Sequence, residues 1–440
     1  MTRPSRNGSL EPGEHSALLD SDVIDSERRG GLLHKDERVW VRWPRHVACL
    51  AWTTLVRDYV NLLLVFVPLG IVAGAVEWDS TVIFSLNFLA IVPLASLLSF
   101  ATEELAATMG QTLGGLLNAT FGNAVELIVS IIALKDRQIR VVQASMLGSI
   151  LSNILLVLGC CFFVGGLRFS QQTFNSTVAS TMSSLMAVSS ASLIIPATLY
   201  AALASTNDPN GPAIENDILF VSHWTSIILL VLYVMYLYFQ LKSHAFLFEP
   251  GSDGGDAEAT AHAIEEEEEE ERTLDPWAAG VLLVIVTVLV AVCADYLVGS
   301  IDSMVMKTGM SRTFIGLILI PIVGNAAEHV TAVIVAYKNK MDLAIGVAIG
   351  SSLQIALFVT PFLVILGWIM GSPMSLHFQV FETVAFFISG LVVILLIQDG
   401  KSNYLEGGMC LGLYAILAVA FYVYPDEMSK DPLVASPGGI

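Results

Sequence analysis

The stretch Phe121–Val129 reads FGNAVELIV and places a glutamate, Glu126, inside a long apolar segment, with Asn123 one helical turn before it. A second stretch, Val323–Thr331, reads VGNAAEHVT and repeats the Gly-Asn-Ala-x-Glu core, again among apolar residues. A charged side chain at the centre of a membrane-spanning helix is unfavourable by roughly 2.5–3.5 kcal/mol on insertion scales. Two such motifs therefore indicate a function that requires both acids.

The composition is that of a membrane protein. The chain has 440 residues, of which 55% are hydrophobic and 14% charged, whereas soluble domains carry about a quarter charged residues. The net charge of −19 comes mainly from residues 249–275, where twelve acids stand against one base. The acidity thus belongs to one segment, and charge gives no support for a nucleic-acid partner. The five cysteines lie in or beside apolar runs, which predicts neither a disulfide framework nor a cysteine metal site.

Apolar runs of about 17–25 residues are typical of spanning helices. Eleven such runs predict eleven transmembrane helices, near 57–76, 82–102, 111–135, 140–166, 177–203, 217–242, 277–299, 312–337, 342–370, 378–398 and 403–424. The acidic segment 249–275 is the long polar interruption between two halves. The first 45 residues lack the apolar core of a signal peptide, so we expect the first spanning helix to direct insertion.

Lysine and arginine predict the orientation, because cytosolic loops carry an excess of these residues. The N-terminal tail and the connections on its side of the membrane hold fifteen of them, against six on the far side. The N-terminus and the acidic linker are therefore predicted to be cytosolic, and the C-terminus to face the other compartment. The loop KDRQIR, residues 135–140, argues against this orientation, since it places three bases on the far side.

The two motifs belong to a repeat with an offset of 202 residues. This offset separates Gly122 from Gly324, the first motif glutamate from the second, and Gly148 from Gly350. Packing motifs of small residues recur in membrane proteins, but they explain neither the glutamates nor the shared register. Each half contains five predicted spans, an odd number, so the second half enters the membrane from the opposite side. Such inverted repeats are typical of secondary transporters, whose substrate site lies near the midplane between the copies.

The predicted fold class is an all-α polytopic membrane protein with one extra N-terminal helix and two five-helix inverted-topology repeats. The predicted parts are a cytosolic tail (1–56), the extra helix (57–76), the first repeat (82–242), an acidic cytosolic linker (243–276), the second repeat (277–424) and a lumenal C-terminal tail (425–440). The sequence is silent on the oligomeric state.

The two motif glutamates, Glu126 and Glu328, repel each other if both are charged within one pocket. Such a pair persists when a cation lies between the carboxylates or when protons neutralise them, and this competition is the basis of cation/proton exchange. Asn123 shares a helix face with Glu126, as Asn325 does with Glu328. Carboxylate and amide oxygens favour calcium or manganese over zinc or copper. The alternative is a helix-packing site with a protonated or hydrogen-bonded glutamate.

Other polar residues stand at membrane depth. Glu103 is a candidate for a vestibule or proton path, although an acid at a helix end that faces water is equally ordinary. His329 points about 100° away from its neighbour around the helix and is either a packing residue or a proton relay. Asp295, Asp302 and Glu382 lie near span ends and are interpreted as solvated. The remaining polar residues at this depth, with the motif glycines, are Glu104, Gln143, Ser149, Ser152, Asn153, Ser351, Ser352, Gln354, Gly122 and Gly324.

The stretches GNAVELIVSIIAL and GNAAEHVTAVIVAYKNKMDLAIGVAIGSSLQI closely resemble the calcium/proton exchanger (CAX) family of the cation/calcium exchanger superfamily. Among its members, the fungal vacuolar exchangers look most similar. The resemblance covers roughly residues 57–424 and includes the acidic segment after the sixth helix. It implies that calcium enters an acidic vacuole from the cytosol in exchange for protons, with some manganese transport and without a cofactor.

The resemblance also implies roles for individual residues. The central cation and proton ligands correspond to Glu126 and Glu328, and their motif partners to Asn123 and Asn325. A polar ligand on the ninth helix corresponds to Gln354. Glu103 is the acid on the second helix, and His329 is the histidine after the second motif. The acidic segment either gathers or senses calcium or is a solvated charge run; its consecutive glutamates are Glu265, Glu266, Glu267, Glu268, Glu269, Glu270 and Glu271.

Three other functions stay open at this point. A sodium/calcium exchanger of the same superfamily would take up calcium in response to a sodium gradient. An intramembrane metalloprotease requires His-Glu-x-x-His spacing, whereas Glu328 precedes His329 and no second histidine follows at the required distance. A calcium-buffering protein centred on the glutamate run would need only an anchor, for which eleven spans are excessive.

Overall fold

The computed structural model describes residues 59–206, 212–248 and 274–425. Tyr59 and the residues from Val60 onward belong to two different units. The predicted tails, most of the predicted linker and the glutamate run 265–271 lie outside the described residues. The described helices (α, or η for 3-10 and π-helices) and strands are η1 Tyr59–Val65, α3 Phe66–Ala75, α4 Ser80–Thr108, α5 Gly110–Phe121, α6 Ala124–Lys135, α7 Ile139–Leu151, η2 Ser152–Val157, α8 Leu158–Arg168, β1 Gln172–Thr173, α9 Ser176–Thr206, α10 Pro212–Tyr238, η3 Phe239–Ser243, η4 Ala245–Leu247, α12 Pro276–Thr308, α13 Arg312–Phe314, η5 Ile315–Leu319, α14 Ile320–Gly324, α15 Ala326–Tyr337, α16 Met341–Gln354, η6 Ile355–Val359, α17 Thr360–Met370, α18 Val380–Ile397, β2 Lys401–Ser402 and α19 Tyr404–Val423.

Eight of the described helices are long and apolar enough to cross a membrane, or up to ten if each of two bent pairs is one span. The bent pairs are α5 with α6, at 47°, and the segment α13–α14 with α15, at 58°. A shorter apolar helix, Val60–Ala75, coincides with the first predicted span. Each of the eleven predicted ranges thus meets a helix or a helix pair, while eleven membrane crossings stay a prediction.

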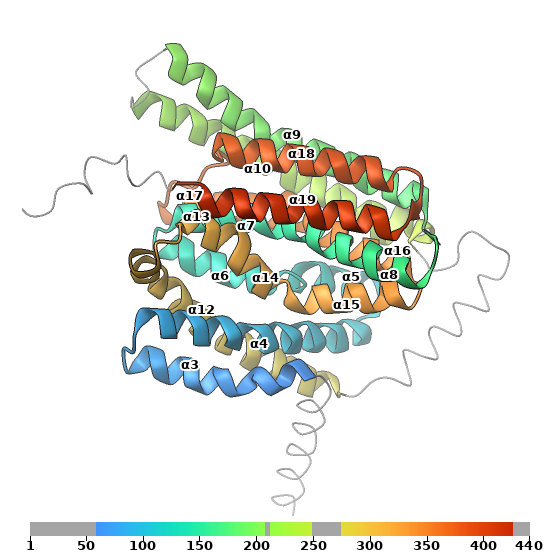
Figure 1. Ribbon diagram of the computed structural model, residues 1–440, viewed down its shortest axis with the longest axis horizontal. Helices are drawn as coiled ribbons and strands as arrows, with labels where there is room; N and C mark the ends of the chain where they lie inside the picture. Colours follow the sequence, from blue (N-terminus) through green and yellow to red (C-terminus); the bar gives the residue numbers. More distant parts are fainter. Residues whose placement is uncertain (1–58, 207–211, 249–273, 426–440) are drawn as a thin grey trace, which may run out of the picture. The chain divides into compact units, whose positions relative to one another are not determined.

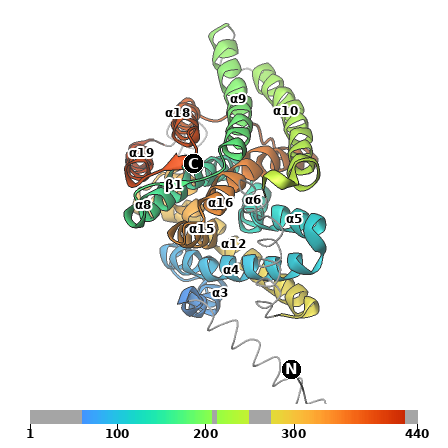
Figure 2. The same cartoon turned by 90° about the vertical axis from the view of Figure 1, so that its right-hand side faces the viewer.

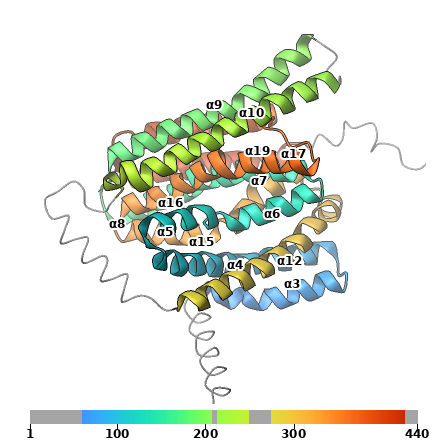
Figure 3. The same ribbon diagram turned by 180° about the vertical axis from the view of Figure 1, so that it is seen from behind.

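The two halves of the chain interlock. Helix α4 packs on α12, α8 on α19, and α9 on α18, so each of these pairs joins an early helix to a late one (Figure 1). Figure 2 shows α6, α15 and α16 between α4 on one side and α9 and α18 on the other. Seen from behind, α5 and α6 change direction where they meet (Figure 3). The helices that carry the two motifs therefore contact elements of both halves, while α15 keeps Val330, Ile334 and Tyr337 exposed on its outer face.

A two-residue antiparallel ladder is the one departure from the all-α prediction within the described ranges. Gln172 of β1 lies opposite Ser402 of β2, because two connections run extended beside each other at this end of the helices. The side chain of Gln172 donates to the carbonyl oxygen of Ala336 at 2.9 Å. It also donates to Asn339 Oδ1 at 3.0 Å, which ties the connection after α15 to the two strands.

An ion pair between a partly exposed arginine and a buried glutamate joins the halves at the other end of the continuous helix α7–η2–α8. Arg140 Nη2 lies 2.6 Å from Glu382 Oε1, and Glu382 is fully buried, so its interpretation as a solvated residue is wrong. The other oxygen of Glu382 accepts the backbone N–H of Gln379 in a capping box that begins α18. Gln143 accepts from Arg140 at 3.0 Å and donates to the carbonyl oxygen of Ser375. The burial of Glu382 could not be predicted, because its partner Arg140 stands 242 residues earlier in the sequence.

Other charged residues at this end keep contact with solvent. Asp295 and Asp302, predicted to be solvated, keep 57% and 50% of their side chains exposed. Asp79 caps the start of α4 and accepts from Lys307 Nζ at 2.6 Å. The hydrogen bond from Lys307 holds the pKa of Asp79 below its usual value.

The 202-residue offset also holds in the backbone. Helices α6 and α15, residues 124–135 and 326–337, coincide under it, and each follows a motif asparagine that stands at the N-cap. Two residues after each helix a side-chain-bearing residue has positive φ, Arg137 at 57° and Asn339 at 64°. A positive φ is uncommon outside glycine. Its recurrence at the same offset shows that the two halves share local backbone structure as well as motif letters.

Candidate functional site

The motif residues lie where two helices break. Helix α5 ends at Phe121 and α6 begins at Ala124, while α14 ends at Gly324 and α15 begins at Ala326. Glycine is a poor helix former and asparagine favours the N-cap position, so the Gly-Asn pair ends one helix and begins the next. Each motif glutamate is then the third residue of its helix, where free N–H groups carry partial positive charge. Both breaks thus place a carboxylate at a helix N-terminus inside the protein.

The carboxylate of each motif glutamate lies near the break of the other motif. A Cβ atom added to Gly324 would lie 2.8 Å from Glu126 Oε1, and one added to Gly122 would lie 3.8 Å from Glu328 Oε1. Each carboxylate therefore lies against the glycine of the other motif. The fold thus brings together the two acids that the repeat singled out, across 202 residues of sequence.

A hydrogen-bond network crosses this pocket from Asn123. Its Nδ2 donates to Gln354 Oε1 at 2.7 Å, and its Oδ1 accepts from Ser351 Oγ at 2.9 Å. Ser351 Oγ in turn accepts from Asn153 Nδ2 at 3.1 Å. Although Asn123 is the N-cap of α6, its side chain makes no capping bond. The network therefore joins α6 to α16 and η2 instead of closing the helix end.

Several polar atoms of the pocket have no hydrogen-bond partner among the described residues. They are Glu126 Oε1, Glu328 Oε2 and both amide atoms of Asn325, and Glu126 and Asn325 are 5% and 1% exposed. A buried polar group without a partner is unfavourable by about 1–3 kcal/mol. Carboxylate and amide oxygens are ligands that hard cations such as calcium prefer. The unpartnered oxygens of Glu126, Glu328 and Asn325 are therefore suitable ligands for a hard cation.

The two acids differ in their access to solvent. Glu126 is buried, whereas Glu328 and Gln354 keep part of their surface exposed. In the part of the chain that the structure describes, no three His, Cys, Asp or Glu side chains are grouped so that they could hold a metal ion. The pocket is thus a pair of carboxylates completed by amides and hydroxyls, with its more accessible side at Glu328.

Two further predicted residues meet each other beside the pocket. His329 Nε2 lies 3.3 Å from Ser152 Oγ on η2. His329 is thus paired with a hydroxyl on a neighbouring element, as expected if the histidine points away from its adjacent glutamate. Packing and proton relay both stay compatible with this contact.

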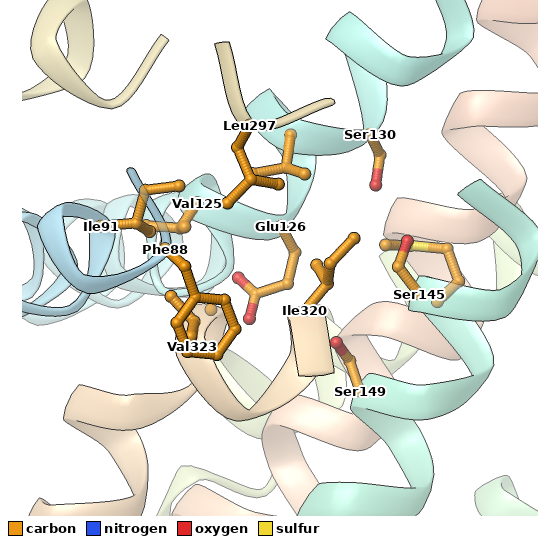
Figure 4. Close-up of a pocket in the computed structure, with 13 residues that line it drawn as sticks. Phe88, Ile91, Val125, Glu126, Ser130, Ser145, Ser149, Leu297, Ile320 and Val323 are labelled. Carbon is orange, nitrogen blue, oxygen red and sulfur yellow. The ribbon is translucent and has the colours of Figure 1, made fainter. Parts of the chain in front are cut away.

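The other predicted residues lie at different places. Ser149 lines a small cavity beside Glu126 (Figure 4). Ser352 Oγ donates to a backbone carbonyl of its own helix at 2.9 Å. Glu103 is exposed on α4 and accepts from Ser99 at 3.4 Å. Gln143 belongs to the ion-pair cluster described above, so neither it nor Ser352 joins the hydrogen-bond network of the pocket.

Sequence reasoning missed Ser130, which lines the same cavity as Glu126 and Ser149 (Figure 4). The signal was available, because Ser130 follows Glu126 by four residues and so shares its helix face. Asn153 was noted only as polar at membrane depth, and its link to the pocket through Ser351 could not be read from spacing. Contacts between separate helices have no local sequence signal.

Three comparisons with known proteins cover most of the chain. The family profile described as sodium/calcium exchanger protein matches residues 79–242 and 278–423. The vacuolar calcium ion transporter of Schizosaccharomyces pombe is 51% identical over 385 residues, 86% of this chain and 88% of that relative. Vacuolar cation/proton exchanger 5 of Arabidopsis thaliana is 40% identical over 434 residues, 96% of each chain. The solved structure of native YfkE is 37% identical with a TM-score of 0.68, and the match covers 83% of this chain and 100% of YfkE.

Proposed function

The chain belongs to the sodium/calcium exchanger protein family, and from this premise we propose that it carries calcium from the cytosol into an acidic vacuole in exchange for protons. The pocket in which Glu126 and Glu328 each lie against the glycine of the opposite motif supports the proposal most. Relatives named for vacuolar calcium transport and cation/proton exchange support the same cargo and compartment. Because the chain belongs to a family of transporters, a function as an intramembrane metalloprotease is excluded.

Competition between calcium and protons would drive the exchange. Two buried carboxylates that face each other repel when both are charged, and either a divalent cation or bound protons removes the repulsion. A calcium ion is held when the carboxylates have lost their protons, and it leaves when a high proton activity neutralises them. One site can therefore serve both ions in turn, which is the requirement for antiport.

The other ligands follow from the hydrogen-bond network. Asn325, whose buried amide has no partner among the described residues, supplies an oxygen from the second break. Asn123 and Gln354 now bond to each other at 2.7 Å and would turn their oxygens to the ion, since calcium takes six to eight oxygens. Manganese also accepts carboxylate and carbonyl oxygens, so we include it as a second cargo.

Alternating access would expose this site to one compartment at a time. The 202-residue offset in motifs, in the N-cap asparagines and in the residues with positive φ supports two inverted five-helix repeats preceded by one extra helix, eleven spans in all. In this arrangement the N-terminus and the glutamate run 265–271 face the cytosol, where the run would regulate calcium entry, and the C-terminus faces the lumen. Calcium and protons would shift the balance between the cytosol-open and lumen-open states to the extent that they bind one state more tightly than the other.

The decisive experiment separates the two driving ions. Purified protein in proteoliposomes should take up radiolabelled calcium when the vesicle interior is acidic and sodium is absent. A sodium gradient at equal pH should produce no uptake. The family description also names sodium, so sodium/calcium exchange is the second function under test. Uptake that follows the sodium gradient and ignores the pH gradient would replace the first proposal by the second.

Gly324→Ala should reduce proton-driven calcium uptake by roughly 10- to 100-fold, because a methyl group 2.8 Å from Glu126 Oε1 must displace the carboxylate and a shift of about 1 Å can have this effect. The initial rate of calcium uptake measures it. Gly346→Ala is the matched control, since a Cβ there meets nothing within 4 Å. Equal rates for the two variants would contradict the close packing of the pocket.

A further inference from the structure

Helix α7 crosses an element of the second repeat at very close range. A Cβ atom added to Gly148 would overlap the backbone of Leu317 in η5, whose Cα would lie 2.7 Å from it. One turn earlier in α7, the side chain of Ala144 lies 2.8 Å from a Cβ added to Gly316. Small residues allow two backbones to approach in this way within a membrane protein. This contact, which we call the α7–η5 crossing, therefore has no room for a side chain at Gly148.

The corresponding positions of the second repeat carry glycine but make no such contact. Under the 202-residue offset, Gly350 and Gly346 of α16 correspond to Gly148 and Ala144. Among the described residues, a Cβ atom added to Gly350 would meet only Met182 Cε, at 3.6 Å, and one added to Gly346 would meet no atom within 4 Å. Glycine inside a helix is less favourable than alanine. The packing in this structure thus gives no reason for either glycine.

The repeat predicts that the partner of α16 is α5. Helix α5 carries Gly114 and Gly115 at the positions of Gly316 and Leu317. Whereas α7 packs on η5, α13 and α14, α5 packs on α4 and η3, and α16 has no comparable packing with α5 in the described chain. Figure 2 shows α5 at the edge of the bundle, apart from α16. The α5–α16 crossing, which is the equivalent of the first by the repeat, is therefore open.

The exposed fractions of corresponding side chains show the same asymmetry. Ile315 of η5 is fully buried, whereas its counterpart Leu113 of α5 is 57% exposed. Val141 of α7 is 1% exposed, whereas its counterpart Leu343 of α16 is 43% exposed. Apolar side chains on both helices are thus covered at the first crossing and uncovered at the second.

The open crossing leads to the more accessible side of the site. Helix α16 ends at Gln354, and a Cβ atom added to Gly122, at the end of α5, would lie 3.8 Å from both Gln354 Oε1 and Glu328 Oε1. Both of these side chains keep part of their surface exposed. In the proposed orientation this crossing lies toward the cytosol, whereas α7 follows the lumenal loop 135–140 and places the α7–η5 crossing toward the lumen.

We propose that the structure is closed toward the lumen and open toward the cytosol, and that calcium passes to the lumen after α5 closes onto α16 at Gly346 and Gly350. The inference rests on the proposed function and assigns its alternating access to two particular contacts. Because the halves are copies of each other, closing the second crossing gives it the geometry of the first, in which no side chain fits at Gly148. Gly350 is therefore required by the lumen-open state and not by the present one.

Gly350→Ala and Gly346→Ala form a matched pair on one helix, one turn apart. Both methyl groups fit the present structure, so neither variant should lower the midpoint of thermal unfolding or weaken equilibrium calcium binding in detergent. Gly346→Ala installs the residue that α7 carries in its closed crossing and should transport as the wild type does. Gly350→Ala should reduce proton-driven calcium uptake roughly 10- to 100-fold, because its methyl group overpacks the closed crossing. Equal uptake by the two variants would overturn the proposed closure.

Reporter cysteines test the asymmetry without any transport. In a chain whose native cysteines are replaced by alanine, Gly346→Cys should react in detergent with a membrane-impermeant maleimide, since this position is exposed. Its counterpart Ala144→Cys should stay unlabelled, since Ala144 has no exposed surface. Labelling of both at the same rate would overturn the assignment of one open and one closed crossing. If wild-type vesicles show no pH-driven uptake, the proposed function fails, while the labelling still decides between equal and unequal crossings.

Discussion

Glu126→Gln should abolish proton-driven calcium uptake, and Glu328→Gln should do the same. Glutamine keeps the size of the side chain but neither carries a negative charge nor exchanges a proton near neutral pH. Each variant leaves one carboxylate at the two breaks, where each acid lies against the glycine of the opposite motif. With one carboxylate, the site binds calcium weakly, and calcium and protons no longer compete for a pair of acids, which exchange requires. The measurement is calcium uptake into proteoliposomes with an acidic interior.

An exposed glutamate is the control for this pair. Glu215 lies on the surface of α10, so Glu215→Gln changes the net charge equally and should transport as the wild type does. Calcium binding to detergent-solubilised protein, measured at equilibrium, should weaken in Glu126→Gln and Glu328→Gln and stay unchanged in Glu215→Gln. Uptake at the wild-type rate by Glu126→Gln would remove the central role of this residue.

Arg140→Met should destabilise the protein by roughly 1–3 kcal/mol, because the buried carboxylate of Glu382 loses a hydrogen-bonded partner whose own side chain is 35% exposed. Arg140 Nη2 lies 2.6 Å from Glu382 Oε1, and the side chain of Glu382 has no exposed surface. The pair joins α7 to α18 and so joins the two halves of the chain. The midpoint of thermal unfolding in detergent should fall well below that of the wild type.

The control is an ion pair at the same end of the helices that is exposed. Lys135 and Asp295 are 4.0 Å apart with 66% and 57% of their side chains exposed, and such pairs contribute about 0–1 kcal/mol. Lys135→Met should therefore change the midpoint little. The double variant Arg140→Met with Glu382→Gln should recover much of the loss, since the buried charge is gone. Equal midpoints for Arg140→Met and Lys135→Met would show that the buried pair contributes no more than an exposed one.

The helices could be predicted well because their signals are local. An apolar run of sufficient length predicts a helix wherever it lies, and each predicted range meets a helix or a bent pair. The bends at Asn123 and Asn325 were not predicted, although the Gly-Asn pairs marked their positions. A hydropathy window averages over both sides of such a break, so 111–135 and 312–337 each looked like one continuous span.

The repeat was readable from sequence alone because it consists of matching letters at a constant offset. The same offset recurs in the N-caps and in the positive φ values of Arg137 and Asn339. Glu382 shows the opposite case, since its partner stands 242 residues earlier and nothing near it in sequence indicates burial. Its position near a span end favoured a solvated side chain, and that interpretation was wrong.

The sequence by itself determined that this is a membrane transporter chain with two matching acidic motifs, because hydropathy and spacing depend only on residue order. The tertiary structure alone decided that each acid packs against the other motif's glycine, that Asn123 bonds to Gln354 across 231 residues, and that Ser130 joins Glu126 at a cavity. The physical reason is that helix periodicity orients side chains around one axis, whereas close packing between axes selects which of those faces meet.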